Sequence, residues 1–256
     1  MSFFSVRGLS KRFGGLDALD DVSFEVEKGS IFSVIGPNGS GKSTAFNCIN
    51  GIYKPTAGTI HFEGEQISGL KPHRIARRGL ARTFQNIELF ANESTVDNLM
   101  LGRHQHMRTG LWSGMGMLGR TTRAAREEAE NRAHVEQVME TLDLTAVRDR
   151  PVQELPYGTQ KRVELGRALA MEPKLLLVDE PSAGMNSEER DDIGERLRSL
   201  RDDLGLTILL IEHHMQLAID LADRVLALNF GKVIAFGAPD EVRSHPEVIK
   251  AYLGDG

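Results

Sequence analysis

Hydrophobic and polar residues alternate near the N-terminus of the chain, and this alternation predicts strands. Apolar side chains take every second position over residues 4–6 and again over 22–26. Such a pattern is typical of strands with one buried face, and it indicates an antiparallel sheet. Residues 59–62 predict a further short strand. The intervening segment 11–15 is expected to form a turn that exposes the aromatic ring of Phe13.

Continuous apolar runs later in the chain predict buried parallel strands. They occupy 31–35, 175–178 and 206–211, and two further strands are expected at 224–228 and 232–236. Helical segments are expected between and after the strands, at 44–50, 71–78, 123–143, 155–173, 187–204 and twice within 239–253. Alternating strands and helices indicate an α/β fold built on a mostly parallel sheet.

A glycine-rich stretch joins the apolar run at 31–35 to the expected helix at 44–50. It reads Gly36-Pro37-Asn38-Gly39-Ser40-Gly41-Lys42-Ser43. A strand, a Gly-rich loop ending in Gly-Lys-Ser and a helix form the context of a phosphate-binding P-loop. Backbone N–H groups and the helix N-terminus bind the phosphates. We therefore expect nucleotide binding by this loop and Thr44, with Lys42 on the β- and γ-phosphates and Ser43 on Mg²⁺.

Acidic and histidine residues follow two of the apolar runs. Asp179 and Glu180 come directly after 175–178, and His213 follows 206–211. Parallel sheets keep their ligands at the carboxyl ends of the strands. Asp179 is expected in the Mg²⁺ shell, and Glu180 is expected to polarise the attacking water as general base. For His213, contact with the γ-phosphate is favoured over a metal site, because adjacent histidines point apart and no third ligand is apparent.

Three segments allow two interpretations each. Phe13 could stack on a purine base or pack at the edge of the sheet. The basic stretch from Lys71 to Arg82 could bind a phosphate backbone, although a solvated helix face is the favoured interpretation. The insertion at 102–122, rich in Gly and Met and carrying Trp112, could contact a partner or pack on its own domain.

Composition narrows the classes of function. The chain has 256 residues, with 31 Lys and Arg against 36 Asp and Glu for a net charge of −5. That balance disfavours nucleic acid as a partner. The single cysteine, Cys48, excludes an internal disulfide and indicates a reducing compartment. Neither a signal peptide nor an apolar run near the ~20 residues that span a bilayer is present. We expect a cytoplasmic protein that reaches a membrane through a partner.

The order of these motifs resembles that of ATP-binding-cassette ATPases over nearly the whole chain. The features in register are Phe13, the loop 36–43, Gln85, the block 155–160, the run 175–180, the turn 182–186 and His213. The resemblance implies a single ATPase domain over 1–256, with a P-loop NTPase core, an N-terminal antiparallel β subdomain and an inserted α-helical subdomain at about 90–165. A helical tail would cover 238–256.

The resemblance also implies ligands and roles. ATP and Mg²⁺ are the expected ligands, with Phe13 on adenine and Gln85 linking Mg²⁺ and the attacking water to the helical subdomain. Asn186 would lie in a turn that meets a second ATPase subunit. The 155–160 block of one subunit would complete the site of the other, through the residues Tyr157, Gly158, Thr159 and Gln160.

That block departs from the usual family sequence Leu-Ser-Gly-Gly-Gln. Pro156 stands where the family has the Ser whose hydroxyl contacts the γ-phosphate, while Gly158 is kept. The departure implies a weaker contact across the dimer interface.

Within the family, the chain most resembles the ATPase of branched-chain (hydrophobic) amino-acid importers. The supporting stretches are 13–16, 102–122, 155–162, 182–186, 211–215 and the tail 234–253. The resemblance implies two transmembrane permease subunits, a second ATPase subunit (identical or not) and, indirectly, an extracytoplasmic solute-binding protein. The chain would then be peripheral, at the cytoplasmic face of the membrane. His214 stands where these relatives usually carry Asp.

Other classes remain open at this point. Urea/amide importers and the lipopolysaccharide-exporting ATPase have similar cassettes. A nucleic-acid-linked cassette ATPase and a non-catalytic, nucleotide-dependent assembly module are further alternatives. The single P-loop disfavours the nucleic-acid-linked cassette ATPase. The non-catalytic assembly module is disfavoured by the joint presence of Gln85, Asp179, Glu180 and His213.

Overall fold

The computed structural model describes residues 2–83, 88–106 and 123–253. The chain divides into two compact units, one made of Met1–Gln85 with Lys174–Gly256 and one of Asn86–Pro173. The second unit is longer than the inserted segment of about 90–165 expected from the sequence.

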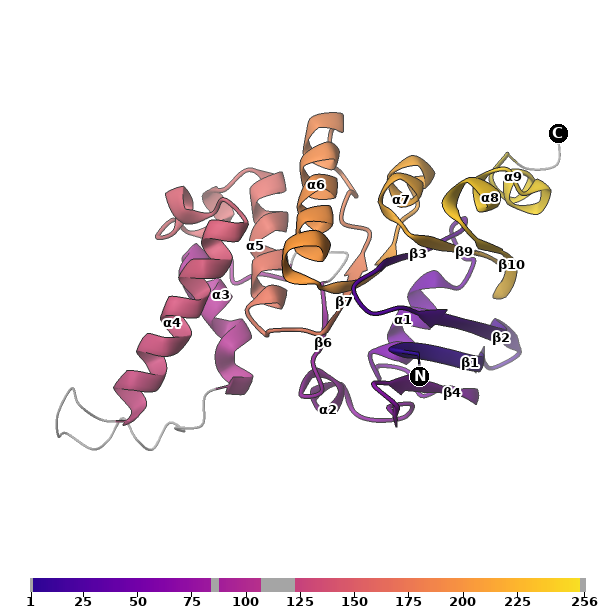
Figure 1. The fold of residues 1–256 in the computed structure, drawn as a ribbon, viewed down its shortest axis with the longest axis horizontal. Helices are drawn as coiled ribbons and strands as arrows, with labels where there is room; N and C mark the ends of the chain where they lie inside the picture. The colour runs from indigo at the N-terminus through magenta and orange to yellow at the C-terminus, as the bar shows by residue number, and fades with distance from the viewer. Residues whose placement is uncertain (1, 84–87, 107–122, 254–256) are drawn as a thin grey trace. The chain divides into compact units, whose positions relative to one another are not determined.

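An antiparallel sheet begins the first unit (Figure 1). Its strands are β1 (Phe4–Phe13), β2 (Leu16–Val26), β4 (Ala57–Phe62) and β5 (Glu65–Gln66), in the order β2-β1-β4-β5. The turn predicted at 11–15 is wrong in extent, because β1 continues to Phe13 and leaves only two glycines between the strands. Arg12 pairs with Asp17 across this exposed end at 2.5 Å. Such polar pairing carries no apolar alternation, so the pattern could not show it.

A six-stranded sheet forms the centre of the same unit. It contains β3 (Ile31–Ile35), β6 (Leu80–Arg82), β7 (Leu175–Asp179), β8 (Thr207–Ile211), β9 (Arg224–Asn229) and β10 (Lys232–Gly237), in the order β10-β9-β3-β8-β7-β6. Neighbouring strands are parallel except β10, which is antiparallel to β9. All residues of β3, β7 and β8 are buried, as continuous apolar runs predict. The prediction of a mostly parallel sheet is confirmed.

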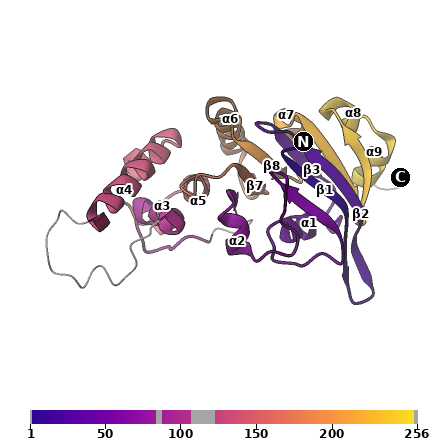
Figure 2. The same ribbon diagram turned by 60° about the horizontal axis from the view of Figure 1, so that its bottom comes forward.

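Helices cover both faces of this sheet. They are α1 (Lys42–Ile49), α2 (Pro72–Ala76), α6 (Ser187–Leu204), α7 (Met215–Leu221), α8 (Pro239–Arg243) and α9 (Pro246–Leu253). Figure 2 shows α1 on one side of β3 and α7 and α8 on the other. Residues of β3 follow this division: Phe32 belongs to the same apolar cluster as Phe46 of α1, whereas Ile35 belongs to a second cluster with Val242 of α8 and Val248 of α9.

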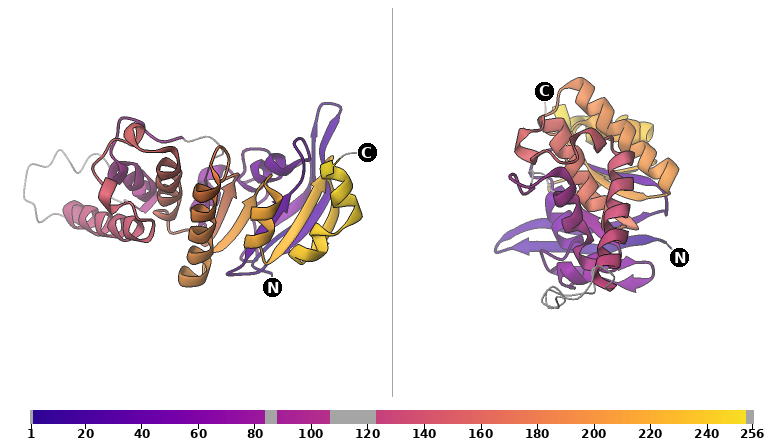
Figure 3. Two further views of the ribbon diagram at one scale, coloured as in Figure 1. Left: turned by 90° about the horizontal axis from the view of Figure 1, so that it is seen from above. Right: turned by 90° about the vertical axis from the view of Figure 1, so that its left-hand side faces the viewer.

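The second unit is helical (Figure 3). It contains α3 (Thr95–Gly102), η1 (Arg103–His106), α4 (Arg123–Thr141), η3 (Thr145–Val147), η4 (Val152–Glu154) and α5 (Tyr157–Leu169). Helix α3 lies against both α4 and α5. The apolar positions predicted to face the core of this region are all buried, namely Val135, Val138, Met139 and Leu142. Helix α5 ends at Leu169, before the predicted end at Pro173.

No helix in the described part of the chain combines the length and the apolar character that a membrane span requires.

Candidate functional site

Three parallel strands end at one edge of the six-stranded sheet. Strand β8 lies between β3 and β7, and Ile211 at its end is paired with Val34 on one side and Asp179 on the other. The residues that follow these strands are therefore neighbours at the carboxyl edge, where α/β sheets bind their ligands. This edge brings together the predicted phosphate loop, the predicted carboxylates and His213.

The phosphate loop starts in a tight space. Gly36 has a φ of 151°, and a Cβ on this residue would lie 2.3 Å from the carbonyl oxygen of Leu228. Only glycine fits there, so the loop runs close against β9. At its other end Gly41 precedes α1, and no side chain caps that helix. The backbone N–H groups of the first helical turn thus remain for an anion.

Lys42 lies inside the curve of this loop. Its side chain is buried, and Nζ donates to the carbonyl oxygens of Gly36 at 2.7 Å and Pro37 at 3.0 Å. Burial lowers the pKa of Lys42, and the carboxylates of Glu180, Asp179 and Glu212 oppose that shift. The ammonium group is thus held over the loop in an acidic surrounding.

Asp179 is buried, and its two carboxylate oxygens differ in their contacts. Its Oδ2 accepts from Arg82 at 2.6 Å, while Arg82 also donates to Asn47 Oδ1 at 2.6 Å. Among the described residues, Asp179 Oδ1 has no hydrogen-bond partner. A buried carboxylate oxygen without a partner fits a hard cation such as Mg²⁺, which takes oxygen ligands. Ser43, at the start of α1, offers an exposed hydroxyl of the same ligand type.

Arg82 requires a correction to the interpretation of the basic stretch. Counted with Lys71–Arg82 as a surface that could bind phosphate backbones, it is instead 8% exposed and faces the carboxylate of Asp179. Arg78 pairs with Glu65 at 2.9 Å. Arg82 therefore does not belong to the exposed basic stretch. The sequence gives no signal for the Arg82–Asp179 pair, because the two residues are 97 positions apart.

Glu180 and His213 come together in the same unit. Glu180 Oε2 lies 3.6 Å from His213 Nδ1, a separation slightly too long for a hydrogen bond. Glu180 is nearly buried and His213 is half-exposed. Glu180 also has a φ of 47°, and non-glycine residues keep such backbone strain mainly where the structure needs the side chain in a set place.

Glu212 has a positioning role that the sequence did not reveal. It is fully buried, with Oε1 accepting from the backbone N–H of Ser182 and Oε2 from that of His214, each at 3.1 Å. One carboxylate thus connects the turn after β7 to the end of β8. An acidic residue directly after a wholly apolar run was the available signal.

A cleft of about 490 Å³ opens over the phosphate loop. Its lining residues are Phe13, Leu16, Asp17, Ala18, residues 38–44, Glu180 and Phe230. Phe13 meets Tyr53 edge-on, with ring centroids 5.2 Å apart, and Lys11 Nζ lies 4.8 Å from its centre. The ring is still 41% exposed, so Phe13 both packs at the sheet edge and presents a face to the cleft.

Phe230 also lines the cleft, although it was not expected from the sequence. It is 82% exposed and has a φ of 45° in the turn between β9 and β10. An aromatic residue before Gly231, in a turn between two strands, was a signal for it.

The 155–160 block lies in the second unit, at the start of α5. Tyr157 is the first residue of that helix and is 41% exposed, so Gly158 and Thr159 belong to its first turn. No side chain caps this N-terminus, where Pro156 precedes the helix. Gln160 Nε2 donates to the Leu155 carbonyl at 2.9 Å, which holds the entry to the helix.

The remaining predicted residues differ in what the structure says of them. Asn186 caps α6, accepting from the backbone N–H of Glu189 at 3.0 Å. Gln85 lies outside the described residues, as does most of the 102–122 insertion, including Trp112.

The fold and the cleft define a nucleotide-binding ATPase with a phosphate loop. Residues 19–183 match the ABC transporter family, and residues 232–256 match the C-terminal family described as branched-chain amino acid ATP-binding cassette transporter. The chain therefore belongs to the ABC transporter family, and it is one of the ATP-binding members.

Its relatives specify the group within that family. The chain is 43% identical to the high-affinity branched-chain amino acid transport ATP-binding protein BraF of Pseudomonas aeruginosa over 250 residues, 98% of this chain and 97% of the relative. It is 42% identical to LivG of Escherichia coli, a protein described in the same words, over 251 residues and the same shares. The crystal structure of the ATP-binding cassette MJ1267 in its ADP conformation superimposes with a TM-score of 0.86 at 32% identity, each chain being fully covered. The predicted family, the fold and ATP binding are confirmed.

Proposed function

We propose that this chain binds and hydrolyses ATP to power a membrane importer of branched-chain amino acids. The observation that carries the proposal is the grouping of Lys42, Asp179 and the Glu180–His213 pair at one edge of the sheet, in a chain with these relatives. A phosphate cradle, a cation ligand and a base are the parts that ATP hydrolysis requires.

ATP would lie along the cleft, with adenine on the exposed face of Phe13 and the phosphates over residues 36–44. The loop's N–H groups and the uncapped start of α1 would bind phosphate oxygens. Lys42 would exchange its two carbonyl partners for the β- and γ-phosphates. The carboxylates of Glu180, Asp179 and Glu212 oppose the lowering of its pKa by burial.

Mg²⁺ would be held by the Ser43 hydroxyl and Asp179 Oδ1, with Gln85 as a further ligand. When bound it neutralises charge that develops on the phosphates. Arg82 fixes the Asp179 carboxylate through its other oxygen, so Oδ1 keeps one orientation.

Glu180 would accept the proton of the attacking water. The positive φ of Glu180 sets the direction in which its side chain leaves the backbone, and His213 beside it would contact the γ-phosphate. A general base of this kind contributes about 10²–10⁴-fold to a rate. The residues Tyr157, Gly158, Thr159 and Gln160 of a second ATPase subunit would complete the site from across a dimer interface, without the hydroxyl that Pro156 replaces.

The partners follow from the same proposal. Two permease subunits would carry the substrate through the membrane, a second ATPase subunit would complete the dimer, and a solute-binding protein would deliver cargo outside. The chain would be peripheral at the cytoplasmic face. Closure of the ATP-bound dimer would drive the permeases by its preference for ATP over ADP.

The test compares Glu180→Gln with wild type in the assembled transporter. We expect ATP binding to persist, phosphate release to fall at least about a hundredfold, and leucine uptake into vesicles to stop. Glu195→Gln, an exposed position on α6, is the matched control and should behave as wild type. Wild-type phosphate release by Glu180→Gln would contradict the base role. Uptake of urea instead of leucine by the wild-type transporter would contradict the proposal that the cargo is a branched-chain amino acid.

A further inference from the structure

The tail helix α9 reaches the first residue of the phosphate loop. The backbone N–H of Gly36 donates to the hydroxyl oxygen of Tyr252 at 2.8 Å, across 216 positions of sequence. The Tyr252 ring packs on the apolar cluster that contains Ile35 and Val248. Burial raises the pKa of Tyr252 to about 12, so the phenol stays neutral in the physiological range.

Gly36 is thereby held at both of its polar groups. Its N–H is bound by Tyr252, and its carbonyl oxygen accepts from Lys42 Nζ at 2.7 Å. Its Cα is also enclosed, since a Cβ there would meet Leu228 at 2.3 Å and Ser40 Oγ at 2.5 Å. Tyr252 is the part of this enclosure that comes from the tail.

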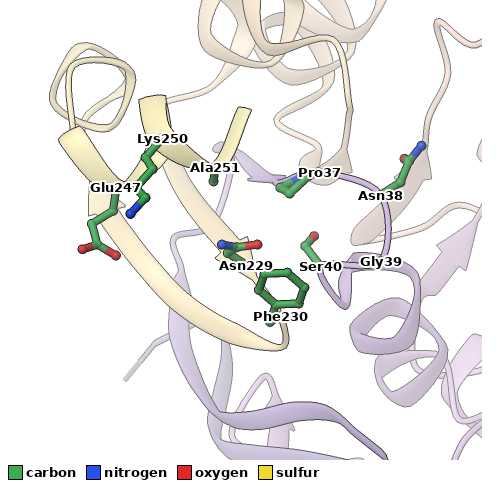
Figure 4. Close-up of a pocket in the computed structure, with 9 residues that line it drawn as sticks. All are labelled: Pro37, Asn38, Gly39, Ser40, Asn229, Phe230, Glu247, Lys250 and Ala251. Atoms are coloured by element: carbon green, nitrogen blue, oxygen red, sulfur yellow. The ribbon is translucent and has the colours of Figure 1, made fainter. Parts of the chain in front are cut away.

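After Gly36 the loop and α9 line opposite sides of one cavity. A cavity of about 500 Å³ lies between the two segments (Figure 4). Pro37 and Ser40 line it on the loop side, and Glu247, Lys250 and Ala251 line it on the helix side. The hydrogen bond between Gly36 and Tyr252 therefore links the loop to α9 at the loop's first residue.

We propose that Tyr252 is a positioning residue for ATP binding, which it serves by fixing the start of the phosphate loop through the Gly36 N–H. The proposal rests on the function proposed above. A loop that is already ordered binds its ligand more tightly, because binding no longer has to order it. Loss of the phenolic oxygen would leave a backbone N–H without its acceptor and give the loop alternative conformations.

The test is Tyr252→Phe in the full-length chain, which keeps the ring and removes the acceptor. We expect the Kd for ATP to rise about tenfold, the value that corresponds to one hydrogen bond. In the assembled transporter KM for ATP should rise by a similar factor while kcat changes less than twofold. Ser244→Ala is the matched control, because it removes a tail hydroxyl that donates to the Asp240 carbonyl at 2.8 Å and does not touch the loop. Its ATP affinity should equal that of wild type.

Two results would overturn the proposal. One is a Tyr252→Phe protein that binds ATP as tightly as wild type. The other is a fall in kcat with KM unchanged. If the variant does not fold, hydrogen exchange of the Gly36 amide in the wild-type protein decides: slow exchange supports the bond, and exchange at the rate of an open loop contradicts it. A wild-type chain that fails to bind ATP would instead contradict the proposed function, which separates the two failures.

Discussion

The guanidinium group of Arg82 and the carboxylate of Asp179 form a buried ion pair, with Nη2 2.6 Å from Oδ2. The side chains are 8% and 3% exposed. The two residues end adjacent strands, β6 and β7. The pair therefore links a proposed Mg²⁺ ligand to the neighbouring strand of the sheet. We expect its loss to lower both the free energy of unfolding and the ATPase activity.

We predict that Arg82→Met lowers the free energy of unfolding by about 3–5 kcal/mol, because it leaves a buried carboxylate without its counter-charge. Urea denaturation at pH 7 measures this. Arg7→Met is the control, since Arg7 pairs with Glu25 at 3.4 Å with both side chains more than half exposed. That exposed pair should be worth less than about 1 kcal/mol. Equal losses in the two variants would contradict the buried role of Arg82.

The two glycines at the start and middle of the phosphate loop should differ in their tolerance of a methyl group. Gly36→Ala places Cβ 2.3 Å from the Leu228 carbonyl, so the backbone must move and ATP binding should be lost. At Gly39 nothing lies within 4 Å of the added Cβ, and only its φ of 79° is unfavourable. Gly39→Ala should therefore cost about 1 kcal/mol of stability. Isothermal titration with ATP checks the binding of Gly36→Ala, and urea denaturation checks the stability of Gly39→Ala. Tight ATP binding by Gly36→Ala would contradict the close approach to β9.

Phe13 should contribute to the binding of the base and not of the phosphates. Stacking of a base on an aromatic ring is worth about 1–3 kcal/mol, so we expect Phe13→Ala to raise the Kd for ATP at least about fivefold. The Kd for tripolyphosphate, which has no base, should stay unchanged. Fluorescence competition measures both ligands on the same protein. If the two affinities fall together, Phe13 acts through the sheet edge and its contact with Tyr53.

Cys48 gives the stability a defined dependence on pH. Burial raises the pKa of this thiol to about 11, against an ordinary value of 9.0, and the charge of Lys11 opposes the shift. The unfolded chain loses the proton first, so stability is full below pH 9 and falls as pH rises towards 11. The difference in unfolding free energy between wild type and Cys48→Ala should change by about 2 kcal/mol from pH 8 to pH 10.5. Urea titrations of both proteins at the two pH values measure it. A difference that stays constant would mean that the thiol ionises equally in both states.

The sequence predicted the elements whose apolar residues are contiguous or strictly periodic. Strands β3, β7 and β8 and helix α6 appear close to the expected bounds. Helices α3 and α7 were not expected from the sequence. In the case of α7 the helix is only seven residues long, so it offers too few turns for a periodicity to stand out.

The parts of the candidate site that could be predicted are those formed by one short, continuous motif. The loop 36–43 specifies a strand, a turn and a helix by itself. Parallel strands place Glu180 and His213 at the same edge of the sheet, and the adjacency of β7 and β8 in the structure brings them close. Arg82 and Tyr252 were not predictable, because each acts on the site through a partner far away in sequence. Their residue types have no local meaning until the fold brings the partners together.

The buried carboxylate of Glu212 has a mechanical consequence. Because it binds the N–H groups of Ser182 and His214 at the same time, the turn after β7 and the end of β8 cannot shift independently. That turn is the segment proposed to meet a second subunit, and the end of β8 carries the proposed phosphate sensor. The binding of a neighbouring subunit at the turn and the loss of the terminal phosphate at the end of β8 would then displace the same coupled element. Each event would therefore change the structure at the site of the other.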